Sequence, residues 1–216
     1  MLVVSVPYRN EILEFCMNPL YLAPIIGILV LIVIDQVARR LAYRKMNALY
    51  REHRYEDLLR FLTSWYPRWF FPAYNRQYAI FNTYAQMGNI KEADEQLTIL
   101  FGLKQNDQQR CDLLLRAFQF YLKNGKNSKA ANTLEKITAE ASLAPAVEEL
   151  KQLYEIMAQR SSAYIETMEQ QLDGADLPTK HRLYYLLQLQ YRNKGDKTNA
   201  ERYRKLDESL GTEAAA

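Results

Sequence analysis

The sequence has little of what most enzymes and disulfide-bonded proteins need. Of its 216 residues, only two are cysteines and two are histidines. Cys16 and Cys111 lie in very different segments, so no disulfide framework is expected, which suits a reducing compartment. The two histidines, His53 and His181, are far apart and lack the spacing of zinc ligands.

Motifs for catalysis and nucleotide binding are also missing. There is no glycine-rich phosphate loop, no serine nucleophile elbow and no cysteine–histidine pairing. Acidic residues such as Asp94, Glu95, Glu148 and Glu149 fall on expected helices, where a solvated face is the ordinary interpretation. We therefore expect a protein that is not an enzyme and that holds no metal and no cofactor.

Alternation of apolar and polar residues with a period of two, which is typical of β-strands, is not sustained anywhere. Hydrophobic residues make up 49% of the chain and charged residues 25%, which argues against disorder. The net charge is +3; residues 1–38 carry −2, so the remainder carries +5. That is too little to predict nucleic-acid binding. The expected fold class is all-α.

One long apolar run interrupts this polar chain, FCMNPLYLAPIIGILVLIVI at residues 15–34. Twenty helical residues rise about 30 Å, the thickness of the hydrocarbon layer of a bilayer. A cleaved signal peptide would need a small-residue cleavage site, and a core helix would show a polar face. We predict an N-terminal arm at 1–14 and a single transmembrane helix at 15–35 in contact with membrane lipid.

Basic residues gather after this run. Arg39, Arg40, Arg44 and Lys45 follow it, whereas one basic residue, Arg9, precedes it. Because positive charge stays on the cytoplasmic side, we predict a single-pass membrane protein whose following domain is cytoplasmic. The absence of Gly and Pro between residues 28 and 66 predicts that the helix continues into that domain.

Residues 36–210 contain a repeat with a period near 35. Apparent turns are centred on His53, Gly88, Gly125, Arg160 and Gly195, which are 35, 37, 35 and 35 residues apart. Five residues after each centre come Leu58, Ala93, Ala130, Ile165 and Ala200, and four before come Leu49, Tyr84, Tyr121, Ile156 and Tyr191. Glycine accepts the left-handed conformation that ends a helix, and a small residue lets two helices approach. The pattern predicts about five helix pairs.

This pattern resembles the tetratricopeptide repeat (TPR) family, most plainly at FNTYAQMGNIKEADEQLTIL and FYLKNGKNSKAANTLEKI. The resemblance covers about residues 40–207 and implies a TPR-like α-solenoid at 36–210, followed by a tail at 211–216. The fourth repeat lacks the glycine, and the prolines that often close such repeats are mostly missing. A looser TPR-like solenoid and a non-repeating helical bundle therefore stay open.

In that family, the first helices of the units line a concave groove that holds an extended peptide or a partner's helix. The resemblance implies a groove lined by Arg40, Tyr43, Arg44, Asn47, Asn75, Tyr78, Asn82, Arg116, Gln119, Arg182, Tyr185 and Leu189. Asparagine can pair with a peptide backbone, tyrosine offers a flat apolar face, and arginine favours acidic ligands. A solvated face with ordinary tyrosine packing is the alternative.

Some family members hold a terminal carboxylate with a clamp of two lysines, two asparagines and an arginine. Here Asn47 and Arg116 fall where that clamp needs them, whereas Tyr43, Ala79 and Asp112 occupy its other places. Recognition of a chain terminus by such a clamp is therefore not expected.

The segment WYPRWFFPAY, residues 65–74, joins the first repeat to the second. Pro67 and Pro72 interrupt the helix on either side of Trp69, Phe70 and Phe71. We predict that these aromatic side chains fill the seam between the two repeats. A loop that dips into the membrane is the alternative.

The leading functional hypothesis is a membrane-anchored TPR-like adaptor or scaffold that binds a protein or peptide in its groove. Acidic proteins and peptides are among the expected ligands. A structural subunit of a larger membrane complex is one alternative. An RNA-binding solenoid of the pentatricopeptide kind, which shares the period, is another. Nucleic acid is not expected as a partner because the charge is modest and a membrane span is predicted.

Overall fold

The computed structural model describes residues 19–213, with side chains from 23 to 210, and every regular element in this part of the chain is a helix. The all-α prediction is confirmed for these residues. The chain divides into two compact units, an N-terminal unit, Met1–Lys104, and a C-terminal unit, Gln105–Ala216. The predicted arm at 1–14 and the end of the predicted tail, 214–216, lie outside the described residues.

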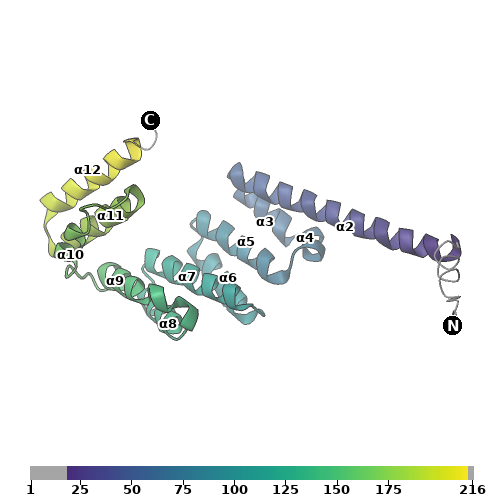
Figure 1. The fold of residues 1–216 in the computed structure, drawn as a ribbon, viewed down its shortest axis with the longest axis horizontal. Coiled ribbons are helices and arrows are strands. Elements are labelled where there is room, and N and C mark those ends of the chain that lie inside the picture. Colours follow the sequence, from purple (N-terminus) through teal and green to yellow (C-terminus); the bar gives the residue numbers. More distant parts are fainter. Residues whose placement is uncertain (1–18, 214–216) are drawn as a thin grey trace, which may run out of the picture. The chain divides into compact units, whose positions relative to one another are not determined.

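The N-terminal unit contains α2 (Pro19–Arg51), α3 (Tyr55–Thr63), α4 (Trp65–Phe70), α5 (Ala73–Gln86) and α6 (Ile90–Gly102) (Figure 1). Helix α2 packs on α3 and α4, α3 packs on α5, and α5 packs on α6. One hydrophobic core joins α2, α3, α4 and α5. Its buried residues are Ala42, Leu49, Leu58, Phe61, Leu62, Phe71 and Ile80. Helix α2 runs without a break from the apolar run into the basic segment, as the missing Gly and Pro residues predicted.

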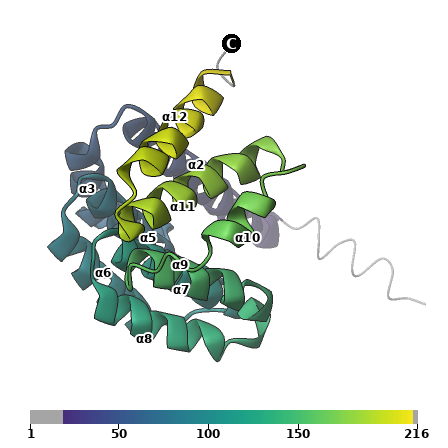
Figure 2. The same ribbon diagram turned by 90° about the vertical axis from the view of Figure 1, so that its left-hand side faces the viewer.

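The C-terminal unit contains α7 (Asp107–Lys123), α8 (Asn127–Thr138), the 3-10 helix η1 (Ala141–Ala146), α9 (Val147–Met157), α10 (Ile165–Gln170), α11 (Leu177–Lys194) and α12 (Lys197–Glu213). Helix α7 pairs with α8, and α11 lies along α12 (Figure 2). The second pair packs around Leu183, Leu187 and Tyr203. Helix α12 extends through residues 211–213, which were predicted to belong to the tail.

The membrane interpretation needs correction. Within residues 19–213, no helix combines the length and the apolar character that crossing a membrane requires. The apolar part of α2 ends at Ile34, and Asp35, which follows it directly, pairs with Arg39 at 2.7 Å. The predicted transmembrane helix at 15–35, its lipid contact and the single-pass membrane localisation are therefore wrong for the described residues; 15–18 lie outside them.

All five predicted turn centres have a left-handed backbone. The φ angles of His53, Gly88, Gly125, Arg160 and Gly195 are 55°, 74°, 67°, 57° and 84°. At four of them, the N–H of the centre donates to the carbonyl three residues before it, and the next N–H donates to the carbonyl four residues before the centre; these bonds span 2.9 to 3.3 Å. This is the Schellman ending of a helix. At the remaining centre, Arg160, the next N–H donates instead to the Glu155 carbonyl at 2.9 Å.

The residue five positions after the turn is buried in these same four turns. Ala93 and Ala130 are 0% exposed, Leu58 is 1% exposed and Ala200 is 6% exposed. An alanine at this position lets the two helices approach closely, as the pattern predicted. Helix pairs α2–α3, α5–α6, α7–α8 and α11–α12 are therefore present. Whether the pairs stack as a TPR-like solenoid stays a prediction.

The fourth predicted pair departs from the pattern because α10 has six residues and packs on α11. A polar cluster holds it there. The Glu169 carboxylate accepts hydrogen bonds from the hydroxyls of Tyr191 and Tyr203, both at 2.7 Å. The fully buried Gln190 accepts a hydrogen bond from the Tyr164 backbone N–H at 2.9 Å. Hydrogen bonds thus replace part of the apolar packing that the other pairs use.

Substitutions at two turns should change stability in opposite directions. Gly88→Ala places a Cβ at a φ of 74° and should lower the free energy of unfolding of the N-terminal unit by about 1–2 kcal/mol. Arg160→Gly removes the same cost and should stabilise the C-terminal unit by about 1 kcal/mol. Urea titration followed by circular dichroism measures both.

The matched control is Gly102→Ala, at the end of α6, where a Cβ meets open space and φ is not left-handed. It should be neutral or stabilising by up to about 1 kcal/mol, because alanine suits a helix better than glycine. Equal losses at Gly88 and Gly102 would contradict the assignment of the turn.

Candidate functional site

The predicted groove residues of the N-terminal unit lie on two helices. Helix α2 carries Arg40, Tyr43, Arg44 and Asn47, all exposed, and α5 carries exposed Asn75 and half-buried Tyr78 and Asn82. The ring of Tyr43 meets Phe71 edge-on with centroids 4.6 Å apart, just before α5 begins. Tyr78 stacks on Tyr74 at 6.0 Å. Aromatic contacts therefore fix the tyrosines of both helices at defined places on this unit.

The predicted groove residues of the C-terminal unit have more internal partners. Arg116 and Gln119 on α7 are exposed, as are Arg182 and Tyr185 on α11, whereas Leu189 on α11 is half-buried. Arg182 forms an ion pair with Glu149 of α9. Leu189 packs against the core beneath α11. The predicted groove residues therefore lie on two helices of each unit, and a groove that joins them stays a prediction.

Acidic residues are absent from two long segments of the N-terminal unit, a feature that the sequence motifs did not indicate. No Asp or Glu occurs at residues 36–51, the second half of α2, or at 58–91, which includes α4 and α5. Exposed arginines without an ion-pair partner among the described residues are Arg40, Arg44, Arg51 and Arg68. A surface with cations and no counter-charges attracts anionic groups. The gaps between acidic residues were visible in the sequence.

The inner side of α4 is fixed to α2. The Tyr66 hydroxyl donates a hydrogen bond to the Ala38 carbonyl at 3.3 Å, and its ring lies 4.7 Å from that of Phe70. Arg39 donates a hydrogen bond to the Phe70 carbonyl at 3.5 Å. Pro67 is buried on the same side. This short helix is therefore held by side chains, which compensates for its small number of backbone hydrogen bonds.

The outer side of α4 carries both tryptophans of the protein. Trp65 is 72% exposed and Trp69 is 77% exposed, and Arg68 between them is exposed as well. The prediction that Trp69 fills the seam between repeats is therefore wrong, whereas Phe71 is 5% exposed and does lie in the core. The physical reason is helical spacing, because residues at i, i+3 and i+4 share one face. That spacing is readable in WYPRWF.

Arg76 on α5 adds a second cation near Arg68. It is half-buried, and its Nε atom is buried without a hydrogen-bond partner. Burial lowers the pKa of Arg76, and the positive charge of Arg68 lowers it further. An anion bound beside the two guanidinium groups would relieve both effects.

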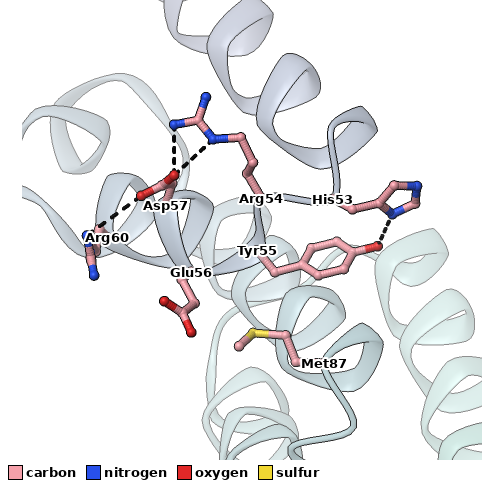
Figure 3. Close-up of a pocket in the computed structure, with 7 residues that line it drawn as sticks. All are labelled: His53, Arg54, Tyr55, Glu56, Asp57, Arg60 and Met87. Carbon is pink, nitrogen blue, oxygen red and sulfur yellow. Dashed lines mark hydrogen bonds and ion pairs between the residues drawn. The ribbon is translucent and has the colours of Figure 1, made fainter.

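A depression of ≈ 450 Å³ lies at the first turn, lined by His53, Arg54, Tyr55, Glu56, Asp57, Arg60 and Met87 (Figure 3). Most of the polar side chains that line it form hydrogen bonds with one another. Arg54 donates to Asp57 at 2.8 and 2.9 Å, and His53 Nδ1 lies 2.8 Å from the Tyr55 hydroxyl. The hydrogen bond to Asp57, followed by that to Glu52, raises the pKa of Arg54. These hydrogen bonds stabilise the first turn.

No group of three or more His, Cys, Asp or Glu side chains able to hold a metal ion occurs in the described part of the chain. That the protein needs neither metal nor cofactor stays a prediction, as does its classification as a protein that is not an enzyme. No protein-family model, no curated protein and no solved structure matches the chain. The candidate site therefore depends on the geometry and charges of its own residues.

Proposed function

We propose that this protein is a TPR-like adaptor that binds a segment of a partner protein on the surface formed by α2 and α5. The observation that carries the proposal is the recurrence of one left-handed turn at intervals of 35 to 37 residues. Repeated helix pairs bury one face of each helix and leave long polar faces exposed, and proteins commonly use such faces to bind other proteins. No membrane anchor is part of the proposal.

The residue types on α2 and α5 support protein binding. Tyr43 supplies a fixed aromatic surface at low entropy cost, because its contact with Phe71 already restrains the ring. Exposed Asn47 and Asn75 can each donate to and accept from a peptide backbone. Arg44 provides a cation for an acidic side chain of the partner.

Site-specific photocrosslinking in cells tests the proposal. Variants with a photoreactive phenylalanine analogue at Tyr43 or at Tyr78 should both crosslink to the same partner, which mass spectrometry identifies. The matched control is the same analogue at Ile99 on α6, which is 43% exposed. Crosslinks that occur equally at Ile99, or that never form at Tyr43 and Tyr78, would contradict the assigned surface.

Charge reversal on α2 should weaken the interaction. Arg40→Glu with Arg44→Glu replaces two unpaired cations by anions and should reduce partner affinity by about tenfold or more, mostly through slower association. Lys91→Glu with Lys104→Glu changes the net charge equally at two other exposed positions of the unit and should have little effect. Biolayer interferometry with the crosslinked partner measures both; equal losses would show that only net charge matters.

A further inference from the structure

We propose that Trp65, Arg68 and Trp69 form a second docking face, which binds an acidic segment of a partner protein through apolar and charged contacts together. The face lies on α4 and is separate from the tyrosines and asparagines of α2 and α5. It is inferred from its own exposure and charge, and it holds whether or not the α2–α5 surface binds a peptide.

The exposed tryptophans are unusual for a surface without a partner. Two indoles, 72% and 77% exposed, stand on adjacent turns of one short helix, and an arginine lies between them. Trp and Arg are the residues most enriched among those that dominate binding energy at protein interfaces. Large apolar side chains gathered at one place on a surface mark interaction sites.

The helix presents these side chains in a fixed arrangement. Tyr66 is hydrogen-bonded to α2, Pro67 is buried, and the Phe71 backbone N–H donates to the Pro67 carbonyl at 2.9 Å. Because the inner side of α4 is anchored, the outer side chains need little ordering when a partner binds. Preorganisation of this kind raises affinity by lowering the entropy cost of binding.

The charge around the face selects an acidic occupant. Arg76 lies close enough to Arg68 for their positive charges to interact, and its buried Nε lacks a hydrogen-bond partner. Arg39 is also near, although its charge is balanced by Asp35 at 2.7 Å. The segment from residue 58 to 91 contributes no carboxylate. A glutamate or aspartate of the partner can therefore pair with Arg68 while neighbouring apolar side chains cover the indoles.

A protein segment is favoured over a nucleic acid because the chain as a whole is only mildly basic. The isoelectric point of the chain is near 8.7. Nucleic-acid-binding domains typically have an isoelectric point above 9. Two indoles and two neighbouring arginines suit a short acidic and apolar segment better than a phosphate backbone, which requires a continuous basic track.

Intrinsic fluorescence tests this inference without a label, because Trp65 and Trp69 are the only tryptophans in the full chain. The probe is a short peptide of alternating leucine and glutamate, and its matched control alternates leucine and glutamine. The glutamate peptide should shift the emission to shorter wavelength, reduce quenching by acrylamide and bind at least tenfold more tightly than the glutamine peptide. Equal binding of the two peptides, or no shift with either, would overturn the proposal.

Variants locate the effect. Arg68→Glu should reduce affinity for the glutamate peptide at least tenfold, whereas Lys91→Glu on α6 should leave it nearly unchanged. Trp65→Phe and Trp69→Phe each leave one indole, and both should still report a shift. Circular dichroism should show unchanged melting, because these side chains are exposed. An Arg68→Glu variant that binds as well as the parent would refute the charge contribution.

Two further probes separate other occupants. A polyuridine oligonucleotide or vesicles of phosphatidylcholine and phosphatidylglycerol should cause smaller shifts than the glutamate peptide at the same salt concentration; a larger shift with either would overturn the proposal. Crosslinking from Tyr43 and Tyr78 should persist in the Arg68→Glu variant. If the parent chain does not bind the glutamate peptide while crosslinks form at Tyr43 and Tyr78, the α4 face has been assigned wrongly. If the peptide binds and no crosslinks form, the α2–α5 surface has been assigned wrongly.

Discussion

Glu169→Ala should lower the free energy of unfolding of the C-terminal unit by about 2–4 kcal/mol, because it leaves two tyrosine hydroxyls without their acceptor. Tyr191 and Tyr203 are 8% and 3% exposed, and each donates to Glu169 at 2.7 Å. The carboxylate connects α10 to both α11 and α12. Removing it should therefore weaken three helices at once, which urea denaturation measures.

The control for this substitution is Glu166→Ala on the same short helix. Glu166 is exposed, so its loss should change stability by less than about 1 kcal/mol. Glu169→Gln keeps an acceptor oxygen but removes the charge and should give an intermediate loss. If Glu169→Ala and Glu166→Ala are equally stable, the cluster does not hold α10 in place.

The same cluster predicts how stability depends on pH. Hydrogen bonds from Tyr203 and then Tyr191 lower the pKa of Glu169 in the folded chain, so its contribution is present above the pKa of an unfolded glutamate and is lost as the pH falls through the folded value. Glu169→Gln should remove that part of the acid dependence. Chemical denaturation at a series of pH values measures the difference between the two proteins.

Tyr191 and Tyr203 determine how stability depends on pH in alkaline solution. Burial, and then the hydrogen bond to Glu169, raises the pKa of Tyr191 to about 12, and the pKa of Tyr203 is raised by the same causes. Their contribution is present below the pKa of an unfolded tyrosine, about 10, and is lost as the pH rises through the folded values. Absorbance of tyrosinate should show that Tyr191 and Tyr203 are among the groups that ionise later than the exposed tyrosines.

Ala93→Leu should destabilise the N-terminal unit by about 1–3 kcal/mol, because it forces extra volume between α5 and α6. Ala93 is 0% exposed. It lies in the first turn of α6, five residues after the left-handed Gly88 that joins α5 to α6. Because Ala93 is fully buried, a leucine there has to displace its neighbours. Thermal melting followed by circular dichroism measures the loss.

Ala48→Leu is the matched control, since Ala48 is an exposed helical position of the same unit. Leucine and alanine are both good helix formers, so this substitution should leave melting almost unchanged. An Ala93→Leu variant as stable as Ala48→Leu would mean that the close approach of the helix pair does not depend on a small residue.

The repeat pattern was predictable because it depends on local chemistry. Glycine at residues 88, 125 and 195 and the alanine five positions later specify a turn and a close helix contact within one short segment. His53 could be assigned to the same class by spacing alone. The irregular fourth repeat was harder, because α10 is held by Glu169, Tyr191 and Tyr203, which are separated by 22 and 34 residues in sequence.

The binding surface was only partly predictable. The resemblance selected exposed residues such as Arg44 and Asn47, but it also selected Leu189, which packs against its own core. The orientation of Trp69 was predicted wrongly because an apolar side chain was assumed to be buried, although its spacing from Trp65 placed both on one helical face. Membrane insertion was predicted from an apolar run, and the described part of α2 does not meet the requirement for a span.

Hydroxyl-radical footprinting of the full chain, alone and with the partner recovered by crosslinking, tests the central claim most directly. Binding on the α2–α5 surface predicts that oxidation of Tyr43 and Tyr78 falls when the partner is present. Tyr185, 44% exposed on the other unit, should be oxidised as before. Protection of Tyr185 with no change at Tyr43 and Tyr78 would contradict the assignment of the binding surface.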